Sequence, residues 1–470
     1  MRKTMDELTR KRRKVTTPLD AFVLTNNKAN LRGLFGIPLP ATDVRSIQER
    51  LTFNPKMFRM QQTQPFCAYE TTSDEILVPR CFGAKIRPSY TDSTHPGENI
   101  ECEFEGLLRD EQYQSRACAL KQMGSPPNCA MLVLPCGFGK TVVALSIISE
   151  LKKKTIIVIN KDFLLEQWKP RIQTFLPMCR VGVIKGKKQE IEDCEIVLAT
   201  VQTIASRGAL PLEEFGFLIV DEAHHMAARF FSKLFARVPC RYILGLTATP
   251  NRKDGCTPLL YMYMGDVAYE KVIHCTSDVQ VHMYNHFNGT GKDILDREGH
   301  PLYALMKTRL VEDCNRNGLI INVTTAEYSK DRKIIILSER VNHLRHLFDE
   351  FKKRDLDVSL YIGETKQKER VLAEKSKLIL GTYALAQEGL DIPSLDTLIL
   401  ATPMSDVTQA VGRILRECDG KKSPLVIDIC DTASASFGRM ASSRKTFYGK
   451  SGFVIHEPGT RSSAKSVCFF

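Results

Sequence analysis

The 470-residue sequence has no apolar run that approaches the roughly 18 residues a helix needs to cross a bilayer. Its first residues, MRKTMDELTRKRRK, contain no apolar stretch like that of a signal peptide. We therefore expect an intracellular protein without a membrane partner. The 15 cysteines include no CxxC pair, which argues against a zinc ribbon, and their odd number argues against a disulfide framework.

Histidine ligands for a metal are also scarce. His282 with His286, and His343 with His346, are the pairs that helical spacing could bring together. Neither pair has a third ligand nearby, so solvated helix faces are the simpler interpretation.

The composition is that of a folded globular protein, since 43% of residues are hydrophobic and 26% are charged. The length corresponds to about three domains of roughly 150 residues each. The net charge of +12 favours a polyanionic partner, but charge does not distinguish nucleic acid from a membrane surface.

The two ends and the N-terminal region show little periodicity. Residues 1–40 contain the basic cluster of residues 10–14 and predict a mobile tail. That cluster fits a nuclear-import signal, a phosphate-binding arm or simply a solvated tail. Residues 41–105 predict a small accessory domain, and residues 459–470 a C-terminal tail.

After Gly106, short apolar β-branched runs alternate with longer amphipathic stretches, which is typical of βα units that build a parallel sheet. The pattern predicts two tandem α/β domains at 106–268 and 331–458, with a connector or insertion at 269–330. The expected strands of the first domain are MLVLP (131–135), TIIVIN (155–160), EIVLAT (195–200), FLIVD (217–221) and YILGLT (242–247). Those of the second are KIIILS (333–338), DVSLYI (357–362), KLILGT (377–382), DTLILA (396–401) and PLVIDI (424–429).

A glycine loop followed by Lys-Thr comes directly after the first of these strands and predicts a phosphate site. Gly137 and Gly139 let backbone N–H groups turn inward, Lys140 can reach the β and γ phosphates, and Thr141 offers a hydroxyl to Mg²⁺. Leu134 stands where the strict GxxxxGK[ST] pattern has glycine, so an ordinary loop is the alternative. The expected nucleotide contacts are Pro135, Cys136, Gly137, Phe138, Gly139, Lys140 and Thr141.

Two adjacent acidic residues directly follow the apolar run 217–220, which is expected to be a buried strand. Ligands of open α/β sheets bind at the carboxyl ends of the strands, where Asp221 and Glu222 would lie. We expect Asp221, with Thr141, to hold Mg²⁺, and Glu222 to orient and deprotonate the attacking water. The alternative is a capped strand end with solvated acids.

The motifs LPCGFGKT (134–141), DEAH (221–224), LTATP (246–250) and QAVGRILR (409–416), in this order, resemble those of a superfamily 2 helicase. LLEQW (164–168) and the Leu before the phosphate loop are similar to the XPB-type branch, including transcription helicases of large DNA viruses. The resemblance implies two RecA-like domains with ATP between them.

The resemblance also implies roles for single residues. Gln112 would lie near the adenine, with Gln114 as a competitor, and Trp168 is more simply a packing residue than a base-stacking one. Arg252 and Asp254 match an Arg-Glu-Asp element of the XPB branch, but Lys253 replaces its acid. By the same resemblance, Thr200, Gln202, Thr203 and Thr382 would contact the nucleic-acid backbone. Gly389 and Asp391 would lie on the nucleotide side. The residues implied to couple ATP hydrolysis to motion are His224, Thr247, Ala248 and Thr249.

The last motif is expected to complete the catalytic site. Spacings of four and three place Gln409, Arg413 and Arg416 on one face of a helix, from which the arginines would act as fingers on the γ phosphate. Two surface arginines are the alternative.

Together these features predict an ATP- and Mg²⁺-dependent helicase or translocase that acts on nucleic acid, with DNA favoured and RNA possible, and with transcription machinery as a further partner. The expected location is the nucleus or, for a viral protein, the virion or host cytoplasm. A nucleotide-switched regulatory subunit of a transcription complex is an alternative. An ATP-dependent nuclease lacks support, because no separate acidic metal site is evident in the sequence.

Overall fold

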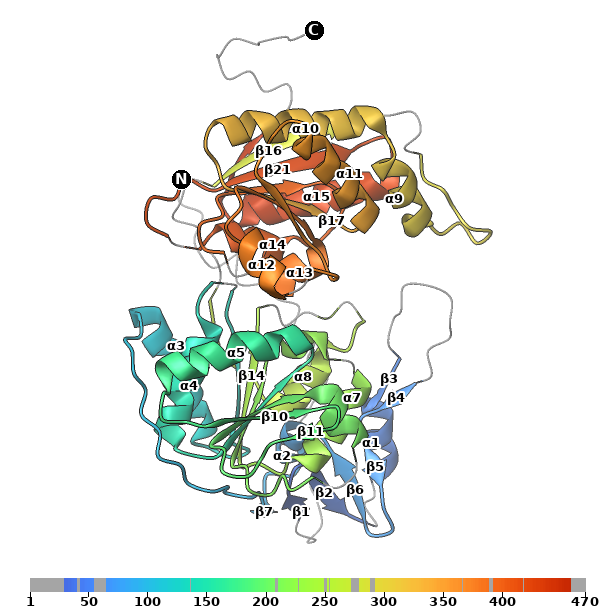
Figure 1. Cartoon of the computed structure of the whole chain (residues 1–470). Coiled ribbons are helices and arrows are strands. Elements are labelled where there is room, and N and C mark those ends of the chain that lie inside the picture. Colours follow the sequence, from blue (N-terminus) through green and yellow to red (C-terminus); the bar gives the residue numbers. More distant parts are fainter. Residues whose placement is uncertain are drawn as a thin grey trace, which may run out of the picture. The chain divides into compact units, whose positions relative to one another are not determined.

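The computed structural model divides the chain into two compact units, Met1–Val133 with Thr141–Glu270, and Leu134–Lys140 with Lys271–Phe470 (Figure 1). The structure describes residues 29–39, 43–54, 65–135, 137–207, 210–226, 228–248, 252, 254–271, 279–287, 292–365, 367–388, 392–416 and 418–457.

The first unit is built on an eight-stranded sheet in the order β11-β10-β12-β9-β13-β14-β8-β15, parallel except for β11. All five predicted strands are present, because continuous apolar runs suit strands that helices cover on both faces. The bounds are β8 Cys129–Val133, β9 Thr155–Ile159, β10 Val181–Lys185, β11 Lys188–Gln189, β12 Ile196–Thr200, β13 Phe217–Val220, β14 Tyr242–Thr247 and β15 Val267–Glu270.

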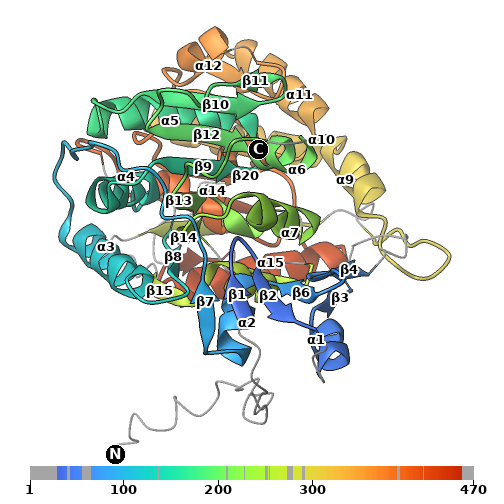
Figure 2. The same ribbon diagram turned by 90° about the horizontal axis from the view of Figure 1, so that it is seen from below.

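Helices cover both faces of this sheet. Figure 2 shows α3, α4 and α5 on one side and α6 and α7 on the other. The side chains of α6, α7 and α8 share one core with the strands, which includes Phe231, Phe235 and Tyr263. The bounds are α3 Asp110–Met123, α4 Lys140–Leu151, α5 Asp162–Phe175, α6 Val201–Ser206, the 3₁₀ turn η1 Ala223–His225, α7 Ala228–Arg237 and α8 Thr257–Met264.

The N-terminal region forms a five-stranded sheet in the order β5-β6-β2-β1-β7 and a separate β3-β4 pair. Its side chains belong to the same core as α7 and α8, and the buried Arg80 donates hydrogen bonds to the carbonyls of Cys240 (2.6 Å) and Arg241 (3.0 Å). The accessory part is therefore fused to the first unit. The bounds are β1 Ala29–Leu31, β2 Phe35–Pro38, α1 Val44–Arg50, β3 Thr52–Phe53, β4 Phe66–Cys67, β5 Glu70–Thr71, β6 Glu75–Val78, α2 Arg80–Ile86 and β7 Tyr90–Asp92.

Residues 29–38 were expected in the N-terminal tail, and this is wrong, because β1 and β2 lie inside that sheet. The run from Leu34 to Ile37 is buried, which supplies the apolar contacts that hold a strand. The basic cluster of residues 10–14 lies outside the described residues, as does the tail of residues 459–470.

The second unit has a seven-stranded, all-parallel sheet in the order β18-β19-β17-β20-β21-β16-β22. The five predicted strands are again present. The expected connector at 269–330 is wrong, because β16 pairs with β21 along its whole length and α10 packs on the sheet. The bounds are β16 Gln280–His286, β17 Ile334–Ser338, β18 Val358–Tyr361, β19 Leu378–Thr382, β20 Thr397–Leu400, β21 Leu425–Asp431 and β22 Val454–His456.

Two cores lie on the two faces of the second sheet. One contains side chains of α10 and α11, and the other contains side chains of α12 to α15. The bounds are α9 Tyr303–Val311, α10 Cys314–Ser329, α11 Val341–Lys352, α12 Gln367–Ala373, α13 Tyr383–Glu388, α14 Thr408–Ile414 and α15 Ala435–Lys450.

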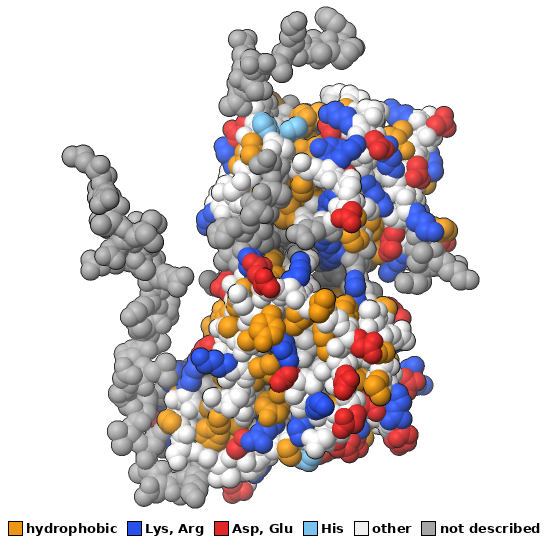
Figure 3. All heavy atoms as spheres, turned by 90° about the vertical axis from the view of Figure 1, so that its left-hand side faces the viewer, with side chains coloured by type: hydrophobic (Ala, Val, Ile, Leu, Met, Phe, Trp, Pro, Cys, Tyr) orange, Lys and Arg blue, Asp and Glu red, His pale blue; other side chains and the backbone are white. Residues whose placement is uncertain are grey.

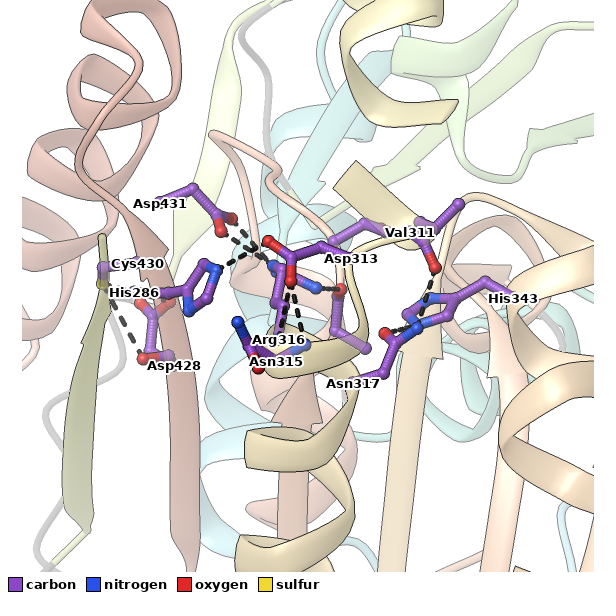
Figure 4. Close-up of polar contacts among 12 residues, drawn as sticks. His286, Val311, Asp313, Asn315, Arg316, Asn317, His343, Asp428, Cys430 and Asp431 are labelled. Atoms are coloured by element: carbon purple, nitrogen blue, oxygen red, sulfur yellow. Dashed lines mark hydrogen bonds and ion pairs between the residues drawn. The ribbon is translucent and has the colours of Figure 1, made fainter. Parts of the chain in front are cut away.

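A buried polar network attaches α10 and β16 to this sheet (Figure 4). The fully buried Arg316 of α10 forms two bonds, of 2.7 and 3.0 Å, to the carboxylate of Asp431 at the end of β21. Asp313 caps α10 and lies 3.0 Å from Nε2 of His286 on β16. A buried charge is tolerated when it is paired and hydrogen-bonded, as Arg316 and Asp431 are here. This pair therefore favours α10, rather than another helix, at this position on the sheet.

The expectation that the two histidine pairs lie on solvated helix faces is wrong. His282 and His286 lie on strand β16 rather than on a helix. His343 is on α11 but is buried, with its ring nitrogens near Asn317 (2.9 Å) and Ser338 (3.1 Å), and burial lowers its pKa to about 3. Within the described ranges, no group of three metal-ligating side chains comes together.

The helices of the described part do not include one that is both long and apolar enough to span a bilayer. On the face drawn in Figure 3, Lys and Arg side chains are interspersed with Asp and Glu.

Candidate active site

Three motifs directly follow three neighbouring strands at one edge of the eight-stranded sheet. The strands β13, β14 and β8 are parallel and adjacent, with Thr247 paired with Val133 and Gly245 with Val220. The phosphate loop follows β8, the Thr-Ala-Thr segment follows β14, and the acid pair follows β13. Because parallel strands end at the same edge, segments that are about 110 residues apart in sequence lie side by side.

The loop after β8 has the backbone of a phosphate cradle. Gly137 and Gly139 have φ values of 84° and 92°, a region in which a side chain is strained. The N–H of Phe138 bonds back to the carbonyl of Pro135 at 3.2 Å, which makes the turn tight. Lys140 is the first residue of α4 and Thr141 the second, so both lie at a helix N-terminus, where anions are favoured. Cys136 lies outside the described residues.

The acid pair is held by its own backbone and by a tryptophan. Asp221 is 7% exposed; its Oδ1 accepts the N–H of Glu222 at 2.9 Å, and its Oδ2 accepts Nε1–H of Trp168 at 2.9 Å. Glu222 has φ 46°, ψ 47°, an uncommon conformation for a residue with a side chain. The carboxylate and the Thr141 hydroxyl are oxygen ligands of the kind that Mg²⁺ prefers, so these residues fit that ion.

Trp168 lies on α5 and is 2% exposed, so its expected packing role is confirmed. Its indole bond to Asp221 was missed, because nothing in the LLEQW motif indicates which residue 53 positions away receives the N–H. The bond fixes the orientation of the carboxylate expected to hold the metal.

Replacing Trp168 with Phe keeps an apolar ring in this place but removes the N–H donor. We expect the Mg²⁺ concentration for half-maximal ATPase activity to rise by about 10-fold, as for loss of other outer-shell partners of metal ligands. A magnesium titration of the ATPase rate measures this, with Gln173→Ala, on the exposed side of α5, as the control. An unchanged midpoint in a folded Trp168→Phe protein would contradict a positioning role.

The proposed coupling residues are partly connected. Thr247 is fully buried, and its Oγ1 lies 2.8 Å from Nδ1 of His224, which is itself 3.4 Å from Oε2 of Glu222. The contact from Thr247 to the acid pair thus runs through the histidine. Ala248 is half-buried beside them, and Thr249 lies outside the described residues.

Arg252 attaches the segment after β14 to the turn that follows the acids. It donates to the carbonyls of His224 (3.1 Å) and Met226 and forms a two-pronged pair with Asp254. Burial alone would raise the pKa of Asp254, but the hydrogen bonds from Arg252 lower it overall. The two residues that match the Arg-Glu-Asp element therefore bind each other and the site backbone. Lys253 lies outside the described residues.

Two of the expected nucleic-acid contacts are buried in the first unit. The hydroxyls of Thr200 and Thr203 lie 2.7 Å apart, and that of Thr203 also accepts the N–H of Gly186. These side chains hold the end of β12 and do not present their hydroxyls at the surface. Gln202 is exposed and donates to the carbonyl and side chain of Asn160.

Gln112 is also buried, at the third position of α3. Its Oε1 accepts the N–H of Arg109 at 3.0 Å and so caps the helix. Gln114, the alternative, is exposed.

In the second unit, Thr382 is half-buried at the end of β19, while Gly389 and Asp391 lie outside the described residues. Gln409 and Arg413 are buried on α14, at 9% and 8% exposure, and share one face. The helix ends at Ile414, so the expectation that Arg416 lies on it is wrong. The chain leaves the helical conformation before Arg416 and continues into the loop that contains Gly420 and Lys421.

Family models match both units. Residues 106–252 match the model described as "Type III restriction enzyme, res subunit", and residues 316–418 match "Helicase conserved C-terminal domain". The first matched stretch contains the phosphate loop and the acid pair, and the second contains the arginine helix.

Similar proteins occur in large DNA viruses. The chain is 31% identical to "Putative ATP-dependent RNA helicase L396" of Acanthamoeba polyphaga mimivirus, covering 88% of this chain and 83% of that protein. It is 27% identical to "Putative ATP-dependent RNA helicase QP509L" of African swine fever virus, covering 71% of each.

A solved structure shares the fold. Dbp5 of S. cerevisiae, bound to RNA and ADP BeF3, aligns with a TM-score of 0.51 at 15% identity, covering 74% of this chain and 94% of that one. The two parallel-sheet units are therefore RecA-like domains, as the motifs predict. With this fold, both family models and the relatives of large DNA viruses, the chain belongs to the superfamily 2 helicases and is an ATP-hydrolysing nucleic-acid helicase.

Proposed function

We propose that this helicase is an ATP-driven DNA translocase of the XPB-like, DEAH-type branch. The observation that carries the proposal is the shared edge of the adjacent parallel strands β13, β14 and β8, which the acid pair, the Thr-Ala-Thr segment and the phosphate loop directly follow. A site for phosphate, metal and water on one rigid edge is what hydrolysis of a triphosphate requires.

The proposed work of each residue follows from its chemistry. Lys140 neutralises the β and γ phosphates, and Asp221 with Thr141 holds Mg²⁺, which neutralises phosphate charge when bound. Glu222 orients the attacking water and accepts its proton. Arg413 and Arg416 of the second unit act on the γ phosphate as it leaves, so that hydrolysis depends on both units.

Nucleic acid is proposed to contact the chain mainly through its backbone. Gln202, exposed on α6, and Thr382, at the end of β19, are the described candidates that remain. Backbone contacts are indifferent to base sequence, and affinity for a polyanion falls with salt. Because two relatives are named as RNA helicases, RNA is the second candidate substrate.

The ATPase rate in the presence of single-stranded DNA, duplex DNA and RNA tests this function, with Lys140→Ala as the inactive control. We expect DNA to stimulate hydrolysis most strongly and the stimulation to weaken between about 50 and 200 mM salt. Stronger stimulation by RNA would assign the RNA helicase role. A magnesium-dependent rate that ignored all three polymers would overturn the proposal.

The proposed cellular role rests on the similarity to helicases of large DNA viruses. A function in transcription or repair of a large DNA virus fits the relatives, with a transcription complex as partner and the nucleus, virion or host cytoplasm as location. Co-purification of the tagged protein with viral RNA polymerase subunits from infected cells would support it.

A further inference from the structure

Two cysteines far apart in the sequence lie side by side in the first unit. The sulfur atoms of Cys102 and Cys179 are 3.1 Å apart, and the residues are 1% and 7% exposed. A disulfide needs about 2.05 Å between the sulfurs, so a movement of roughly 1 Å would join them.

Both cysteines are held in place by their surroundings. The carbonyl of Cys102 accepts the hydroxyl of Ser149 on α4 at 3.1 Å. Three residues on, the N–H of Glu105 bonds to the carbonyl of Phe175 at the end of α5 at 2.9 Å, and the ring of Phe104 stacks on that of Phe175. The Cys179 N–H bonds to the carbonyl of Leu176. The sulfur contact is therefore part of a fixed arrangement of α4, α5 and the segment that leads into α3.

The contact also makes the two thiols unequal. The thiol of Cys179 donates its hydrogen bond to the sulfur of Cys102. This bond lowers the pKa of Cys102 against the effect of burial, and the same bond, with burial, raises the pKa of Cys179. The thiolate is the reactive form of cysteine, so Cys102 is the nucleophile of the pair.

We propose that Cys102 and Cys179 are a redox modification site, at which a peroxide forms a reversible disulfide. The Cys102 thiolate attacks one oxygen of hydrogen peroxide, which breaks the O–O bond and gives a sulfenic acid and hydroxide. The Cys179 thiol then attacks the sulfenic sulfur and water leaves, so that two thiols and one peroxide yield one disulfide and two waters. The site is distinct from the proposed active site, because the described hydrogen bonds of the two cysteines join them to each other, to Ser149 and to Leu176.

The cross-link would close a loop of 77 residues that includes α3, α4 and α5. Closing such a loop restricts the unfolded chain more than the folded one. We expect the oxidised protein to unfold at a temperature about 5–10 °C higher than the reduced protein, and dithiothreitol to reverse this change. ATPase activity should be retained.

Peptide mapping of the full chain tests the proposal directly. The protein is treated with hydrogen peroxide, free thiols are blocked with N-ethylmaleimide, and the non-reduced digest is analysed by mass spectrometry. We expect a peptide pair joined through Cys102 and Cys179 that disappears on reduction. Because the exposed Met178 is also a target of peroxide, reversal by dithiothreitol separates the disulfide from methionine oxidation.

Variants test the effect on stability. Cys102→Ser and Cys179→Ser should each lose the temperature rise, while Cys118→Ser, on α3 in the same unit, should keep it. The proposal is overturned if the exposed Cys67, Cys314 and Cys418 are oxidised without any 102–179 cross-link. It is also overturned if the temperature rise persists in Cys102→Ser. Mapping of the wild-type chain decides the question even if a serine variant does not fold.

Discussion

Replacing Glu222 with Gln is expected to reduce the nucleic-acid-stimulated ATPase rate by at least about 100-fold, within the range measured for loss of a general base. Glutamine has the same shape but cannot accept a proton. The side chain of Glu222 is 15% exposed and lies beside His224, so its position is set by the turn after β13 rather than by solvent.

The measurement is steady-state ATPase activity together with the affinity for a fluorescent ATP analogue, which should change little. Glu213→Gln, on the exposed loop before β13, is the matched control. A variant that keeps more than half of the wild-type rate would show that another group activates the water. The same variant tests the regulatory-subunit alternative, since a nucleotide-binding switch would keep its role without hydrolysis.

Replacing Arg413 with Ala is expected to lower the maximal ATPase rate by on the order of 1,000-fold, the scale of an arginine finger. Arg413 is buried on α14, one turn after Gln409 and on the same face. An arginine supplies a planar fork for phosphate oxygens that lysine lacks, so Arg413→Lys should recover only a small part of the rate.

Loss of a buried arginine can also destabilise the second unit, so thermal unfolding must be measured with the rate. Arg309→Ala, on the exposed side of α9, is the control for loss of one positive charge. If the rate falls only in proportion to the folded fraction, Arg413 has a structural role. The ATPase rate of Arg416→Ala, a residue beyond the end of α14, then shows whether Arg416 acts on the phosphate without Arg413.

The sequence predicted the elements that are local in the chain. The runs of residues 155–159 and 334–338 were recognised as strands because they are continuously apolar and β-branched, as strands covered on both faces must be. The phosphate loop was likewise recognised, since strand, glycine turn and helix follow one another directly. In contrast, β16, with the sequence QVHMYNH, carries polar residues throughout and was placed in a connector.

The residue types of a motif did not indicate which hydrogen bonds its side chains form. Thr200 and Thr203 have the residue types of backbone contacts, yet their hydroxyls lie 2.7 Å apart and bond to each other, and that of Thr203 also accepts the N–H of Gly186. Gln112 has the residue type for a base contact and caps a helix. A motif specifies the side chain but not which of the surrounding groups it bonds to.

The motifs along the chain indicated the enzyme class, because the phosphate loop, the acid pair and the Thr-Ala-Thr segment each follow a strand directly and carry their reactive side chains within a few residues of it. The partners of those side chains are different. Trp168 reaches Asp221 across 53 residues and Arg316 reaches Asp431 across 115, since parallel strands are joined by helical crossovers that separate spatial neighbours in sequence. No local pattern encodes such a pairing, and only the folded sheets bring these groups together.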